Sequence, residues 1–80
     1  MKYWVVIEKA PNNYGAAVPD LPGCVAVGVT REEVEREIKE AIEFHLEGMT
    51  LDNEPIPSPT AYAREIEVDV PVHSAKKKAV

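Results

Sequence analysis

One segment of this 80-residue chain has the spacing of an amphipathic helix, while the other regular segments have the pattern of strands. Thr30 and Glu33 form a capping-box pattern, which predicts that the helix begins directly after Thr30. Apolar residues then recur at three- and four-residue intervals and predict one buried stripe that ends near Gly48 to Leu51. The stripe consists of Val34, Ile38, Ala41, Ile42, His45 and Met49. A single helix covers only one face of a sheet, and this limits the folds open to the chain.

Three short segments before the helix are predicted to be strands. Residues 2–9 are aromatic and β-branched on both faces, which favours a place at the centre of a sheet. Residues 14–18 and 24–29 follow after short connections, so we expect a three-stranded meander. The loop between the second and third strands contains Pro22 and Gly23, and we expect it to be a rigid structural turn.

The sequence after the helix predicts a stiff connector and one more strand. Residues 52–60 hold prolines at every second position from Pro55 to Pro59, which is typical of an extended segment without internal hydrogen bonds. Residues 65–72 alternate strictly between apolar and acidic side chains, and Pro71 marks them as an edge strand. One side of this strand carries Ile66, Val68, Val70 and Val72, and the other carries Glu65, Glu67 and Asp69.

The predicted order is therefore β-β-β-α-β, an α+β fold that matches the first half of the ribonuclease H architecture. A right-handed crossover would lay strand 65–72 parallel to the first strand, which gives the sheet order 3-2-1-4 with the helix on one face. We expect one domain over residues 1–72 and a flexible basic tail at 73–80. The uncovered sheet face would carry Trp4 and Val6, so we predict a homo-oligomer, most simply a two-fold dimer.

Residues that could carry chemistry are scattered along the chain. Glu65, Glu67 and Asp69 would stand about 7 Å apart along one strand, which makes a charged stripe and not a metal-chelating cluster. Cys24 and His45 could form a nucleophilic pair. A histidine within an apolar stripe is more often structural, however, and a lone cysteine is more often a small buried hydrophobe. The sequence therefore predicts a protein that is not an enzyme and has neither a metal nor a cofactor.

The charge is distributed unevenly. Residues 1–75 carry 14 acidic and six basic side chains, whereas three further lysines lie at 76–78. An acidic body repels nucleic acid and attracts basic partners, although acidic surfaces also simply keep proteins dissolved. One cysteine, no signal-peptide pattern and no apolar run near 20 residues predict a cytoplasmic protein without a membrane segment.

Three segments in order resemble the HicB-like antitoxins: PDLPGC (19–24), GVTREEVEREIKEAIEFHLEG (28–48) and EPIPSP (54–59). The resemblance extends to about Val72 and implies a partial ribonuclease H fold. It also implies a non-catalytic role, in which the protein binds and occludes HicA, a small basic toxin that cleaves messenger RNA. Many family members carry a further DNA-binding domain, for which this chain leaves no room before Val80, so we do not expect direct DNA binding.

Two acidic surfaces could contact such a toxin. The outer helix face is partly neutralised by Arg31, Arg36 and Lys39. We favour the outward side of the last strand, because Arg64 is the only basic residue close to it in sequence and because an edge strand offers free backbone groups. The favoured surface consists of Glu65, Glu67 and Asp69, and the helix surface of Glu32, Glu35, Glu40, Glu43 and Glu47. The alternative function is a stand-alone oligomeric scaffold or regulator with another protein partner and no toxin.

Overall fold

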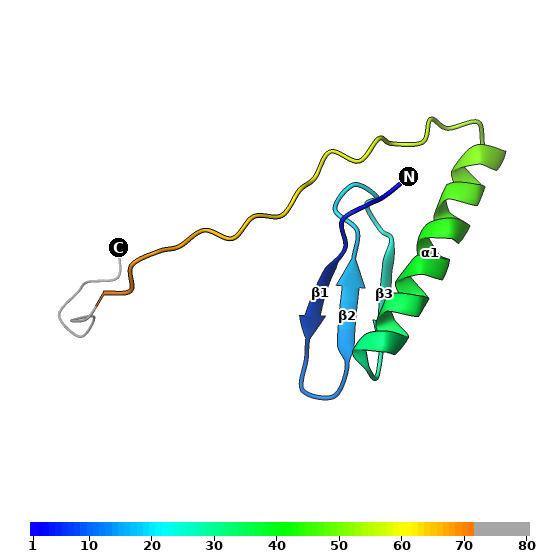
Figure 1. Ribbon diagram of the computed structural model, residues 1–80. Helices are drawn as coiled ribbons and strands as arrows, with labels where there is room; N and C mark the ends of the chain where they lie inside the picture. The colour runs from blue at the N-terminus through cyan, green and yellow to red at the C-terminus, as the bar shows by residue number, and fades with distance from the viewer. Residues whose placement is uncertain (72–80) are drawn as a thin grey trace.

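The structure is a computed structural model and describes residues 1–71. Its elements follow the order β1 (Val6–Lys9), β2 (Tyr14–Ala17), β3 (Val25–Gly28) and α1 (Arg31–Leu51). Figure 1 shows the three strands side by side with α1 laid along them, and the chain after α1 passing the sheet and running away from it. The α+β class predicted from the sequence is confirmed.

The three strands form one antiparallel sheet in the order β1-β2-β3. Ile7, Ala16 and Ala26 are cross-strand partners in one row, and all three pack in or against the core beneath α1. Val6 and Val25 belong to the next row, in which both flank Ala17 and are exposed. Because successive side chains of a strand point to opposite faces, this register separates a helix-facing side from an open side. The predicted meander is confirmed.

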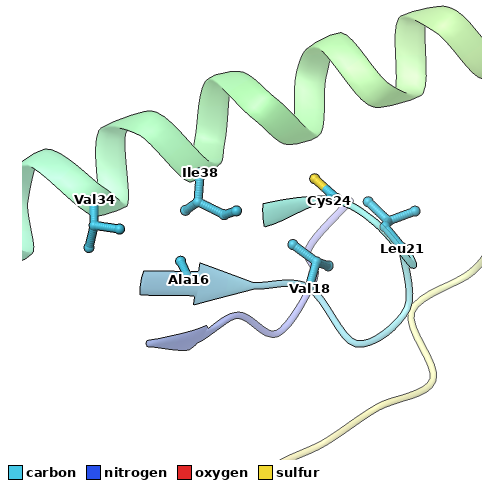
Figure 2. Packing of buried hydrophobic residues seen from close by; sticks show 6 residues of the cluster. All are labelled: Ala16, Val18, Leu21, Cys24, Val34 and Ile38. Atoms are coloured by element: carbon cyan, nitrogen blue, oxygen red, sulfur yellow. The ribbon is translucent and has the colours of Figure 1, made fainter. Parts of the chain in front are cut away.

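The core is small and lies between α1, β2 and the loop that joins β2 to β3. Val34 and Ile38 point from the helix toward the sheet, as Figure 2 shows. The buried hydrophobic side chains are Ala16, Val18, Leu21, Cys24, Val34 and Ile38. Leu21 and Val34 are almost fully enclosed, so the loop contributes to the core as much as the strands do.

The helix begins at a side-chain cap. The Thr30 hydroxyl accepts a hydrogen bond from the Glu33 amide at 3.0 Å, and Thr30 itself has an extended backbone. The Glu33 carboxylate in turn accepts from the amide of Val29, one residue before the Thr30 amide that the capping-box pattern predicts. The reciprocal bond thus reaches back into the β3–α1 connection and joins the cap to the end of the sheet.

Two glycines are required by the local geometry. Gly23 has a φ of +85°, in the left-handed region that favours glycine. Gly28, the last residue of β3, lies against the first turns of the helix, where an added Cβ would stand 2.6 Å from the Val34 amide nitrogen. The close approach of β3 to α1 therefore depends on the missing side chain at position 28.

The fourth strand expected from the sequence is not formed. Residues 65–71 are extended and exposed, and no strand of residues 1–71 pairs with them. The order 3-2-1-4 is consequently observed only for its first three members, and the ribonuclease H-like unit is not confirmed. An alternating segment becomes a strand only when a neighbouring edge accepts its backbone hydrogen bonds, and no edge in the described part of the chain does so. Val72 and the predicted tail at 73–80 lie outside the described residues.

The extended segment gives the chain an elongated form. The radius of gyration is 17.5 Å, whereas a compact domain of this length has about 11–12 Å. We call residues 65–71 the exposed segment.

Candidate protein interface

A groove runs beside β1, between the sheet and α1. It has a volume of about 480 Å³, and its lining is mostly apolar, with exposed charged residues of α1 at its border. Its apolar walls are Tyr3, Val5 and Ile7 from the first strand region and Ile38, Ile42 and Leu46 from the helix. We call it the β1–α1 groove.

The outer edge of β1 adjoins this groove. β1 pairs with β2 on one side only, so its other side has no strand partner among residues 1–71. Such an edge presents backbone donors and acceptors that can pair with another extended segment. A free edge beside an apolar groove is suited to receive a strand with apolar side chains on one face.

The sheet face opposite α1 is open to solvent. Trp4 and Val6 are half exposed, and Val25 and Val27 are about two-thirds exposed. We call Trp4, Val6, Val25 and Val27 the open face. The structure therefore places Trp4 and Val6 on an uncovered apolar surface, while their role in an oligomer stays a prediction.

Two contacts hold the connector after α1 against the sheet domain. The Tyr3 hydroxyl donates to the Pro57 carbonyl at 2.6 Å. The Asp20 carboxylate accepts three hydrogen bonds, from the hydroxyl and amide of Thr60 and from the amide of Ala61, at 2.8–3.1 Å. The Thr60 hydroxyl and these amides favour the ionised carboxylate and hold the pKa of Asp20 below its ordinary value of 3.8. The connector is thus fixed as far as Ala61.

The two acidic surfaces differ in their position relative to the domain. Glu65, Glu67 and Asp69, which we call the acidic row, are exposed on the segment that leaves the domain. The acidic side chains of the helix surface are exposed on α1, where Lys39 and Glu43 make the one ion pair found within residues 1–71, at 2.7 Å. The structure does not bring the two acidic surfaces together.

The residues considered for catalysis are not arranged as a site. Cys24 is buried, and desolvation raises the pKa of its thiol, which disfavours the reactive thiolate. His45 is half-buried on α1 and does not belong to the core cluster beneath the sheet. Within the described part of the chain no three His, Cys, Asp or Glu side chains gather closely enough to hold a metal ion. No helix in residues 1–71 has the length and apolarity needed to cross a membrane.

Sequence reasoning missed the Asp20 contact and the Tyr3–Pro57 bond. Asp20 and Thr60 are 40 positions apart, and Tyr3 and Pro57 are 54 apart, so no local pattern signals either pair. The one available signal was the proline spacing of the connector, which indicates an extended segment able to lie along another surface.

Comparison with known proteins identifies the family. The chain is 47% identical over 57 residues to a 14.9 kDa protein encoded in the rep-hol intergenic region of Haemophilus phage HP1; the match spans 71% of this chain but only 43% of the phage protein. It is 44% identical to a UPF0150 protein of Thermoplasma acidophilum, over 76% of this chain and 90% of that protein. A UPF0150 protein of Helicobacter pylori is 53% identical over 59% of this chain and 65% of its own length. The model of the HicB-like antitoxins of bacterial toxin–antitoxin systems matches residues 3–72, and the chain therefore belongs to this family.

Proposed function

We propose that this chain is an antitoxin that binds a small basic toxin of the HicA type and silences it by occlusion, without chemistry of its own. Family membership over residues 3–72 supports the antitoxin role. The observation that carries the choice of partner is the charge, since residues 1–75 hold 14 acidic and six basic side chains. An RNA-cleaving toxin must present a basic surface to its substrate, and an acidic protein competes for that surface.

We assign the contact to the acidic row. Its three carboxylates stand at alternate positions of an extended segment, and none of them is paired with a basic side chain within residues 1–71. Alternate residues of a strand share one face, so pairing of this segment would put the three carboxylates on one side. The row also lies beyond the fixed part of the connector, which ends at Ala61. It can therefore reach a partner that does not touch the sheet domain. We further propose that the protein acts in the cytoplasm, where messenger RNA is cleaved, and that residues 65–72 complete a partial ribonuclease H unit when they are paired.

The test uses the product of the gene beside this one, which on this proposal is a small basic protein. The purified neighbour should cleave RNA, and addition of this chain in equal amount should stop the cleavage. The double variant Glu67→Lys with Asp69→Lys should slow association strongly at low salt and less at high salt, because exposed charges act mainly by steering. Glu40→Lys with Glu47→Lys is the matched control on α1 and should have a smaller effect.

Two results would contradict the proposal. A neighbour that binds this chain no better than an unrelated basic protein removes the antitoxin role. An association rate unchanged by the double reversal at both salt concentrations removes the acidic row from the contact.

A second candidate function, an oligomeric scaffold or regulator without a toxin, is favoured by the open face. Trp4 is 52% and Val27 67% exposed, and together with Val6 and Val25 they make an exposed apolar surface of the kind that marks protein–protein contacts. A chain that assembles through this face, and whose neighbouring gene encodes no growth-arresting protein, would fit the scaffold.

A further inference from the structure

We propose that two copies of this chain exchange their exposed segments: residues 65–70 of each copy pair with the free edge of β1 in the other copy and place Ile66, Val68 and Val70 in its β1–α1 groove. This inference concerns assembly and does not depend on a toxin. Its starting point is the mismatch between an apolar groove beside an unpaired edge and an apolar strand pattern that has no strand partner within residues 1–71.

The two sides of the proposed contact have the same spacing. Tyr3, Val5 and Ile7 line the groove from alternate positions of the first strand region. Ile66, Val68 and Val70 stand at alternate positions of the exposed segment and are 68%, 70% and 79% exposed. Residues two apart on a strand are about 7 Å apart, so the two sets of three cover equal lengths. Side by side in one sheet, they would form a single apolar face against the helix.

The opposite wall of the groove belongs to α1. Ile38 is buried, whereas Ile42 and Leu46 pack only partly against the core and leave apolar surface in the groove. A strand added at β1 would cover this surface, because its helix-facing side chains lie directly beneath that part of α1. The short core of the single chain, which ends at Ile38, would then be extended along the helix.

The path of the connector favours a second copy over closure within one chain. Asp20 holds Thr60 and Ala61, and Figure 1 shows that the chain beyond them continues away from the sheet and does not turn down along β1. A return to its own β1 would need a bend within residues 62–64. Their sequence, Tyr-Ala-Arg, contains no glycine, proline, asparagine or aspartate, the residues that commonly form tight turns. Because residues 62–64 do not favour a turn, the exposed segment stays extended and can pair more readily with a second copy than with its own chain, which is a simple route to strand exchange.

The exchange also determines where the acidic row would lie. With Ile66, Val68 and Val70 toward the helix, alternation directs Glu65, Glu67 and Asp69 to the opposite side of the sheet. They would therefore border Trp4 and Val6 of the other copy, so that the open face acquires an acidic margin from a second chain. On the proposed function, a basic toxin would then contact a surface built from both copies.

The first experiment measures the mass of the full chain by light scattering during size-exclusion chromatography at micromolar concentration. The wild type should have twice the 8.8 kDa mass of one chain. Val68→Asp should be monomeric, because it places a charge in the groove; Glu67→Gln, the matched control on the outward side, should stay dimeric. Val68 is exposed in the single chain, so the variant should keep the helical circular-dichroism signal of the folded domain.

A mixing experiment separates exchange from other dimers. In Val68→Asp the exposed segment carries a charge and cannot enter a groove. In Leu46→Asp the β1–α1 groove carries a charge and cannot receive a segment. Each variant alone should be monomeric. When the two variants are mixed in equal amounts, the exposed segment of Leu46→Asp can still enter the groove of Val68→Asp. The mixture should therefore form a dimer with one intact contact, at a concentration at least tenfold above that needed by the wild type. Insertion of Asn-Gly after Ala63 supplies a turn and should shift the chain toward a closed monomer in which the exposed segment folds onto its own groove.

Three results would overturn the exchange. A monomeric wild type shows that the segments are not shared. A Val68→Asp variant that remains dimeric, while Val27→Lys on the open face becomes monomeric, assigns the dimer to the open face. Mixed variants that stay monomeric beside a dimeric wild type show that the exposed segment of one copy does not pair with the β1–α1 groove of the other. All three measurements use this chain alone, so their failure would leave the toxin-binding proposal to its own assay.

Discussion

Gly28 and Val34 meet so closely that a Cβ on residue 28 would stand 2.6 Å from the Val34 amide nitrogen and 2.8 Å from its Cα. Both obstacles are backbone atoms of the helix and cannot rotate aside. The contact sets the distance between β3 and the start of α1, and with it the depth of the core below Val34. It connects the end of the sheet to the only helix within residues 1–71.

Gly28→Ala should therefore destabilise the domain by about 1–3 kcal/mol, the cost typical of forcing atoms into a filled space. Urea unfolding followed by circular dichroism measures the change. Gly15→Ala is the matched control within the sheet, because no atom lies within 4 Å of the Cβ that would be added there. Equal midpoints for the two variants would show that β3 and α1 can move apart without cost.

Thr30→Ala should lower the free energy of unfolding by about 0.5–2 kcal/mol, because the Glu33 amide would lose its hydrogen-bond acceptor. Thr50→Ala serves as the control: its hydroxyl donates to the Leu46 carbonyl within the helix and caps nothing. Thermal melts should separate the two variants clearly. Coincident melting curves for Thr30→Ala and the wild type would mean that water accepts the hydrogen bond of the Glu33 amide as well as the Thr30 hydroxyl does.

The Asp20 contact should respond to acid. Because the folded pKa of Asp20 lies below 3.8, the contact's contribution to stability is complete above the unfolded pKa and disappears as the pH falls through the lower folded value. The amide resonances of Thr60 and Ala61 should titrate with a midpoint below 3.8, and Asp20→Ala should remove that titration. A midpoint above 3.8 would show that the carboxylate gains nothing from these donors.

His45→Gln should reduce stability by about 1 kcal/mol, the centre of the range for single substitutions, and leave partner binding unchanged. The half-buried position of His45 on α1 is compatible with a structural role but lies to the side of the core. Unfolding and binding measured on the same preparation test both halves. Lost binding in a variant that unfolds like the wild type would move His45 into an interface.

The elements whose signals are local could be predicted from the sequence. The T-x-x-E pattern located the start of α1, and the stripe through Val34 and Ile38 identified its buried side. The proline pattern likewise anticipated an extended connector, although the residues that hold it lie far away in the chain. The pairing of residues 65–72 could not be predicted. Alternation shows that a segment can form a strand, but it does not show which strand edge the segment pairs with, or whether that edge belongs to the same chain.

The core and the candidate interface were less accessible from the sequence. Leu21 is 1% exposed although it lies between two prolines in a loop, where apolar periodicity carries no information. The β1–α1 groove is lined by Val5 from the first strand region and by Ile42 from the helix, and no part of residues 1–71 fills it. A gap of this kind is a property of three-dimensional arrangement and has no counterpart in residue spacing.

The Tyr3–Pro57 hydrogen bond has a consequence for the order in which the molecule is made. It joins positions 54 residues apart, whereas the hairpins and the helix rest on contacts between near neighbours. Contacts that close long loops form late, because the chain must first lose the freedom of the intervening residues. The meander and α1 can therefore form first, and the connector then docks onto a surface that is already shaped.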